Sequence, residues 1–178
     1  MIPTEIHDQI RRARQLAAEL LAYSSGAAAP PEPRTSRSWS DSVGPLDEFD
    51  RRIRDADLRA ATRTRFDARH FADAIEAGVK VLNEVVRART GLKDDGDSLM
   101  TVAFSPNAPL LRLNQLRSKS ETSEQRGHMM LCQGVVGAWR NPRAHSLVDD
   151  SPRRALMMLE TIDDLITVTR STVRTRKR

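Results

Sequence analysis

Cysteine and aromatic residues are scarce in this chain of 178 residues, and each shortage excludes a class of protein. Cys132 is the sole cysteine, so the chain can form no internal disulfide and no cysteine-based zinc cluster. It lies in the apolar run 129–132, where we expect a small residue of the core. Aromatic residues make up 4% of the chain, which argues against an aromatic-rich β-sandwich and against an RNA-binding sheet that stacks bases on exposed rings.

Long apolar runs and paired metal ligands are also missing. No segment approaches the roughly 20 residues that span a bilayer, and the N-terminus lacks the charged and then apolar order of a signal peptide. We therefore expect a cytoplasmic protein that makes no contact with membranes. No two histidines stand at metal-ligand spacing on one predicted helix, so we expect neither a metal ion nor another cofactor. The histidines are His7, His70, His128 and His145.

Positive charge is in excess. The net charge of +5 and the pI near 10.1 favour a polyanionic partner such as RNA. Basic residues gather at the end of the chain, in the tail 171–178. This tail is either an electrostatic arm, with Arg174, Arg176 and Lys177 as candidate RNA contacts, or merely a solvated end.

Sequence patterns divide the chain into four parts. Residues 1–23 have apolar residues at alternating steps of four and three, which predicts an amphipathic helix that pairs with a partner subunit or docks on the main domain. Residues 24–44 are rich in Pro, Ala, Ser and Arg and are expected to be a linker, with Trp39 as an anchor onto the neighbouring domain. Residues 45–170 form the predicted helical domain, and 171–178 the basic tail.

Helical periodicity dominates the main domain. We predict helices with the bounds 46–66, 69–90, 123–140 and 151–169, a turn over 93–97, and a loop with a short helix over 99–116. Gly91 is expected to end the second helix, and Ser123 and Ser151 to cap the third and fourth. No strand is predicted, so the fold class is all-α, a bundle of four or five helices.

Glycines thin one side of the helix predicted over 123–140. Glycine in a helix costs about 1 kcal/mol relative to alanine, and it is tolerated where another backbone approaches closely. Gly127, Gly134 and Gly137 therefore predict a close neighbour. That neighbour is either the preceding helix or the same helix of a second subunit.

The segment Arg140-Asn141-Pro142-Arg143-Ala144-His145 joins a fixed cation to a titratable imidazole. A histidine can take a proton from a ribose hydroxyl or give one to a leaving oxygen, and an arginine can hold two phosphate oxygens. With Asn141 as an orienting group, Arg140 and His145 are candidates to cleave RNA through its own 2′-hydroxyl without a metal ion.

Geometry and chance leave alternatives open. Five residues of an ideal helix turn through about 500°, which leaves the side chains of Arg140 and His145 about 140° apart. A bend at Pro142 or a two-fold dimer would remove this difficulty. The same spacing recurs in the segment 65–70, which joins an arginine to a histidine as well. A structural role is the other alternative, in which Arg140 satisfies helix carbonyls and His145 caps the next turn.

An ordered series of motifs accompanies this pair between His70 and His145. With these motifs the chain resembles the HEPN superfamily and, within it, the conserved hypothetical family Ymh. The motifs are the segments 70–77, 90–92, 95–96, 99–100, 103–106, 109–114, 124–127 and 140–145.

The resemblance implies a small helical bundle that forms a homodimer. Many HEPN proteins are metal-independent ribonucleases with an arginine, a following polar residue and a histidine at the dimer cleft, positions that Arg140, Asn141 and His145 would fill. Such proteins are frequent as toxins or effectors in toxin–antitoxin, abortive-infection and anti-phage systems, so an antitoxin or a defence complex is an expected partner. The alternative is a non-catalytic module that binds RNA or nucleotide; a DNA-binding regulator ranks third, without a helix-turn-helix pattern.

Three further residues are candidate RNA contacts. Arg143 lies inside the motif, and Glu76 and Lys80 stand one turn apart on the helix predicted over 69–90. Glu76 and Lys80 would line the cleft; an exposed ion pair between them is the alternative.

Overall fold

The computed structural model describes residues 44–145 and 148–175. The chain divides into two units, Met1–Ser42 and Val43–Arg178, and all described residues belong to the second. The predicted helix over 1–23, Trp39 and the basic residues Arg176 and Lys177 lie outside the described residues.

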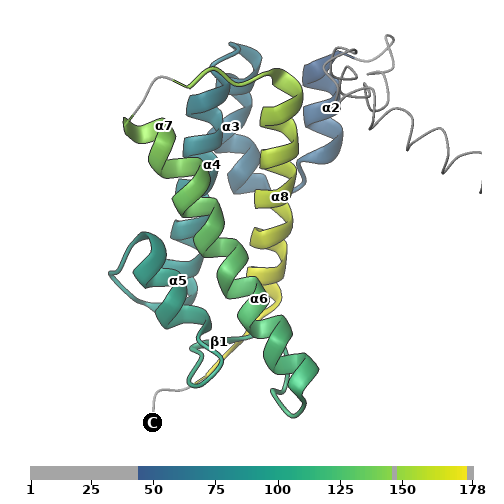
Figure 1. The fold of residues 1–178 in the computed structure, drawn as a ribbon. Coiled ribbons are helices and arrows are strands. Elements are labelled where there is room, and N and C mark those ends of the chain that lie inside the picture. The colour runs from purple at the N-terminus through teal and green to yellow at the C-terminus, as the bar shows by residue number, and fades with distance from the viewer. Residues whose placement is uncertain (1–43, 146–147, 176–178) are drawn as a thin grey trace, which may run out of the picture. The chain divides into compact units, whose positions relative to one another are not determined.

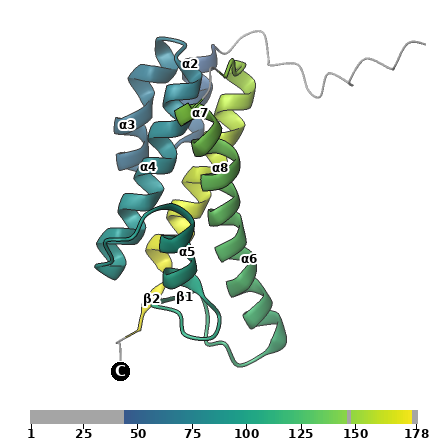
Figure 2. The same ribbon diagram turned by 60° about the vertical axis from the view of Figure 1, so that its left-hand side comes forward.

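The described chain is an all-α bundle, as predicted (Figure 1). One end of the bundle holds α7 and the beginnings of α4 and α8, and the other end holds a two-stranded ladder (Figures 1 and 2). The elements are α2 Pro45–Arg52, α3 Ala56–Asp67, α4 Phe71–Thr90, α5 Gly96–Phe104, β1 Leu111–Arg112, α6 Lys119–Val135, the π-helical turn η1 Val136–Arg140, α7 Asn141–His145, α8 Pro152–Ser171 and β2 Val173–Arg174.

The core forms where α4 packs between α3 and α8. Gly78 marks the closest approach, because a Cβ atom there would lie 2.9 Å from Leu159 Cδ2 and 3.2 Å from Leu58 Cδ1. The glycine thus allows three helices to meet around one point. Large apolar side chains surround it without solvent exposure, among them Ile75, Val79, Leu82, Leu159, Ile162 and Ile166.

The helix predicted over 46–66 is wrong as a single element, because it is broken into α2 and α3. The backbone amides of Arg54 and Asp55 donate to Asp163 Oδ1 of α8, at 3.0 and 2.8 Å. Asp55 also caps α3 by accepting from the amide of Leu58 at 2.9 Å. A carboxylate distant in the sequence therefore takes the amides that a continuous helix would use internally.

Local signals place the ends of α4 and α8 correctly. Gly91 ends α4 with φ of 76°, a left-handed conformation that favours glycine. Ser151 caps α8, whose first residue is Pro152. Between α4 and α6 the structure differs from the prediction. The helix α5 begins at Gly96, inside the segment predicted as a turn, and residues 109–116 form no helix.

The beginning of α6 was predicted at the wrong serine. Ser118 is the cap, and its hydroxyl accepts from the amide of Glu121 at 3.1 Å while the Glu121 carboxylate accepts from the amide of Ser118 at 3.2 Å. This reciprocal capping box outcompetes Ser123, which lies inside the helix.

The prediction of no strand is also wrong, because β1 and β2 form a short antiparallel ladder. Leu111 pairs with Arg174, and the amide of Thr175 donates to the carbonyl of Leu110 at 2.8 Å. The first part of the predicted tail is therefore fixed to the bundle. No helix within the described ranges is long and apolar enough to cross a membrane.

Candidate active site

The segment from η1 to α7 carries the arginine–histidine motif. The amide of Asn141 bonds to the carbonyl of Val136, five residues earlier, so the helix widens by one residue just before the motif. Pro142 has no amide proton, and its ring would clash with a carbonyl in a regular α-helix. We attribute the widened turn to Pro142, which lies within α7 and does not end the helix.

Arg140 lies half-buried at the end of η1. Its Nη1 donates to Asp95 Oδ2 at 3.0 Å, and 26% of its side chain is exposed. Partial burial raises the pKa of Asp95, but the amide of Gly96 and the guanidiniums of Arg140 and Arg87 outweigh burial and lower the pKa below its usual range. Asp95 is therefore a carboxylate that carries its charge opposite Arg140.

Asn141 and His145 are both exposed on α7. They stand four residues apart, so they share one face of this helix. No hydrogen bond joins Arg140 to His145 within the described ranges. Arg140 ends the π-helical turn and His145 ends α7; on an ideal α-helix two positions five residues apart differ by about 140°.

Arg143, a candidate RNA contact, lies in a buried ion pair. Its Nη2 stands 2.7 Å from Asp150, and the two side chains are only 3% and 1% exposed. Its Nη1 also donates to the carbonyl of Trp139 at 2.8 Å. Arg143 thus fastens α7 to the beginning of α8, and it presents no surface for RNA.

The remaining candidates are engaged in contacts within the chain. Lys80 and Glu76 form the exposed ion pair of the alternative interpretation, with 2.7 Å between Nζ and Oε1. Arg174 donates from Nη2 to the carbonyl of Thr90 at 3.1 Å, which ties β2 to the end of α4.

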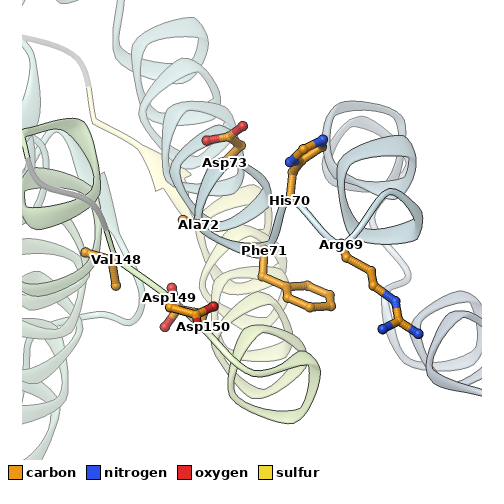
Figure 3. Close-up of a pocket in the computed structure, with 8 residues that line it drawn as sticks. All are labelled: Arg69, His70, Phe71, Ala72, Asp73, Val148, Asp149 and Asp150. Carbon is orange, nitrogen blue, oxygen red and sulfur yellow. The ribbon is translucent and has the colours of Figure 1, made fainter.

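The second match to the motif lies at the junction of α3 and α4. Arg65 donates to the carbonyl of Ala61 in its own helix, and His70 precedes α4. A pocket of about 180 Å³ lies beside His70 (Figure 3). Carboxylates dominate its lining, because Asp73, Asp149 and Asp150 face it while Arg69 is its one cation. Asp150 is paired with Arg143, so Asp73 and Asp149 are the carboxylates that would oppose a phosphate in this pocket.

His128 is a histidine of the core. It is 6% exposed, its ring meets Phe104 edge-on at 4.8 Å between centroids, and its Nε2 lies 3.6 Å from Cys132 Sγ. Burial lowers the pKa of His128 to about 4 and raises the pKa of Cys132 to about 12, so both groups are neutral at neutral pH. The prediction that Cys132 belongs to the core is confirmed.

Two features of the site escaped the sequence. Asp95 was interpreted as part of a turn and, with Gly96, as part of the motif series, but its contact with Arg140 was not predicted. Asn83 was given no role, yet its Nδ2 donates to Asp95 Oδ1 at 2.7 Å. The pattern of a carboxylate before a glycine at a helix start could have pointed to Asp95. Among the described residues, no group of three or more acidic, histidine or cysteine side chains could hold a metal ion.

Comparison with known proteins gives one family. Residues 53–168, well over half of the chain, match the family model described as a protein of unknown function, Hypoth_ymh. Neither the curated proteins nor the solved structures contain a match to the chain. The matched range runs from the end of α2 to the last turns of α8 and includes the whole η1–α7 segment. The chain therefore belongs to the Hypoth_ymh family.

Proposed function

We propose that this protein is a HEPN endoribonuclease that cleaves RNA without a metal ion. One observation carries the proposal: half-buried Arg140 ends the widened turn η1, and Asn141 and His145 follow on α7 with exposed side chains. The second arginine–histidine match lies against carboxylates, and His128 is buried. The motifs shared with HEPN proteins support the same assignment.

The proposed reaction needs a base, an acid and a cation. The imidazole of His145 takes the proton of the ribose 2′-hydroxyl, and the 2′-oxygen forms a bond to phosphorus while the bond to the 5′-oxygen breaks. Arg140 stabilises the added negative charge on the phosphate oxygens, and Asn141 orients the phosphate. The protonated imidazole of His145 then gives its proton to the 5′-oxygen, which leaves a 2′,3′-cyclic phosphate and a 5′-hydroxyl.

A two-fold dimer completes this site. Because Arg140 and His145 leave one helix about 140° apart, a second copy would bring complementary groups to the cleft. The exposed face of α6 suits such a partner: Met130 and Leu131 are 60% and 58% exposed, and nothing lies within 4 Å of a Cβ atom built at Gly134. The preceding helix is therefore not the close neighbour that Gly134 predicted.

The dimer is tested by light scattering on a variant of this face. We expect Leu131→Glu to give a monomer with little RNA cleavage, because a carboxylate would be buried without a partner at the interface. Val173→Glu is the matched control, since Val173 is 56% exposed on β2, at the other end of the bundle from α7. A wild-type monomer at tens of micromolar would contradict the dimer.

The metal-independent reaction is tested with EDTA. We expect cleavage of single-stranded or looped RNA to survive excess EDTA and to stop when the RNA carries 2′-O-methyl groups. The His145→Ala protein, purified in parallel, controls for contaminating ribonucleases. Loss of activity on chelation with rescue by magnesium or manganese would contradict the mechanism.

In the cell, such an enzyme would act as a toxin or effector of an anti-phage, abortive-infection or toxin–antitoxin system. A non-catalytic module that binds RNA or nucleotide in a defence complex is the second candidate. The wide angle between Arg140 and His145 within one chain favours it. Absence of cleavage by the wild-type dimer, with RNA binding retained, would establish this second candidate.

A further inference from the structure

A polar network connects the proposed phosphate clamp to the interior of the bundle. The carboxylate of Asp95 lies between two elements: Oδ2 accepts from Arg140 Nη1 at 3.0 Å, and Oδ1 accepts from Asn83 Nδ2 at 2.7 Å. Arg87 Nη1 stands 3.5 Å from the same Oδ1. One carboxylate thus links η1 to α4.

Asn83 makes this network more than a surface ion pair. It is 1% exposed, and its Oδ1 is buried without a hydrogen-bond partner within the described ranges. A buried acceptor that lacks a partner destabilises a fold, and an apolar residue would avoid that loss. The amide of Asn83 therefore contributes one specific interaction, the hydrogen bond that fixes Asp95.

The loop that carries Asp95 is fixed from a second side. Gly96 follows with φ of 59°, a conformation that favours glycine, and a Cβ atom there would lie 3.5 Å from Val136 Cγ1 in η1. Asp95 is thus held against the widened turn that ends at Arg140. A carboxylate held in this way can orient a partner without moving to meet it.

Arg140 keeps one edge of its guanidinium for a ligand. Asp95 engages Nη1 alone, and Nε and Nη2 of Arg140 have no hydrogen-bond partner among residues 44–145 and 148–175. A guanidinium binds phosphate best through two parallel N–H groups. The contact with Asp95 therefore leaves free the pair of donors that a phosphodiester requires.

We propose that Asp95, fixed by Asn83, is a positioning residue that aims the Nε–Nη2 edge of Arg140 at the scissile phosphate. This inference rests on the proposed ribonuclease function. The opposite role, in which the Asp95 carboxylate occupies the place of the phosphate and weakens RNA binding, is an outcome of the test.

Cleavage kinetics separate the two roles. We expect Asp95→Asn and Asn83→Leu to lower kcat about 10- to 100-fold, with KM and affinity for 2′-O-methyl RNA changed less than about threefold, because the phosphate binds but is misplaced. Asp95→Glu keeps the charge and should recover part of the loss. Asp50→Asn is the matched control, since Asp50 forms an exposed ion pair with Arg63. Tighter binding of 2′-O-methyl RNA by Asp95→Asn, without loss of kcat, would overturn the proposal.

A measurement without RNA keeps the inference independent of the enzyme assay. In ¹⁵N NMR, the Nε–H group of Arg140, assigned with Arg140→Lys, should be ordered in the wild type and mobile in Asp95→Asn and Asn83→Leu. An equally ordered Arg140 in both variants would overturn the positioning role. If the wild type cleaves no RNA while the Arg140 signal behaves as expected, the ribonuclease function fails and the positioning of Arg140 stands.

Discussion

Two segments of this molecule have an arginine five residues before a histidine, and the contacts of the two pairs differ. At the η1–α7 segment, Arg140 donates from Nη1 to Asp95 and has no other hydrogen-bond partner in the described part of the chain, and His145 is exposed. At the α3–α4 junction, Arg65 is used by its own helix and His70 lies beside a pocket lined by three aspartates. Spacing alone does not define a site, and each arginine donates from Nη1 alone; the partner of that donor, a fixed carboxylate or a helix carbonyl, and the pocket beside the histidine distinguish the two matches.

The largest expected difference in RNA cleavage is between variants of His145 and His70, the histidines of the two segments. His145→Ala should lower kcat/KM for RNA cleavage about 10²- to 10⁴-fold, the usual contribution of a general acid or base, and leave Tm unchanged because His145 is exposed. His70→Ala should leave cleavage unchanged. Gel-resolved cleavage beside a thermal melt of each variant measures both effects. A large drop in Tm for His145→Ala would instead assign that residue a structural role.

The two arginines should differ nearly as much. Arg140→Ala should lower kcat about 10²- to 10³-fold, because one donor to a developing oxyanion commonly contributes that much. Arg65→Ala removes only an exposed bond to the carbonyl of Ala61, so it should have no effect on kcat. Equal losses in single-turnover cleavage by the two variants would remove the distinction between the segments.

The ion pair between Arg143 and Asp150 joins the two segments, because Asp150 also lines the pocket beside His70. Arg143→Ala should lower the free energy of unfolding by about 3 kcal/mol, since it leaves a buried carboxylate with Arg154, a mostly exposed side chain, as its remaining cation. Arg154 stands 3.4 Å from Asp150 with 62% of its side chain exposed, so Arg154→Ala should cost less than about 1 kcal/mol. Urea unfolding of both variants checks whether Arg143→Ala loses more stability than Arg154→Ala.

The last effect concerns acid stability, where His128 differs from both motif histidines. Because burial lowers the pKa of His128 from 6.5 to about 4, the unfolded chain binds the proton more readily than the folded one. Its contribution to stability is full above pH 6.5 and is lost as the pH falls from 6.5 to 4, by about 3 kcal/mol in total.

Replacement of His128 tests this assignment. The variant His128→Gln should be less stable at neutral pH but should lose less stability on acidification than the wild type. His70→Gln should leave the pH dependence unchanged, since His70 is exposed. Urea unfolding between pH 4 and 7 gives the slopes, and equal slopes for wild type and His128→Gln would contradict the burial of a neutral imidazole.

Sequence patterns predicted the elements whose signals are local. Gly91 and the pair Ser151-Pro152 set helix ends through their own backbone preferences, and the periodicity of 69–90 needed no distant partner. The capping box of Ser118 and Glu121 is equally local, so the beginning of α6 could have been predicted from the sequence.

Features that depend on distant residues were not predictable. The break before α3 requires Asp163 of α8, and β2 exists because β1 lies beside it. The same holds in the candidate site, where the motif residues were identifiable but the contact of Arg140 with Asp95 and Asn83 was not. Arg143 is a case in which the prediction failed. Its charge predicted a contact at the surface, but the ion pair with Asp150 holds the side chain in the interior.

The chemical nature of the RNA ends tests the central claim most directly. A cyclising reaction carried out by His145 and Arg140 must leave a 2′,3′-cyclic phosphate on one fragment and a 5′-hydroxyl on the other. We predict that mass spectrometry of fragments made by the wild-type dimer in EDTA finds these ends, and that Arg140→Ala and His145→Ala make neither. Fragments with a 3′-hydroxyl and a 5′-phosphate would contradict this mechanism, because they arise from attack by water and not by the 2′-oxygen.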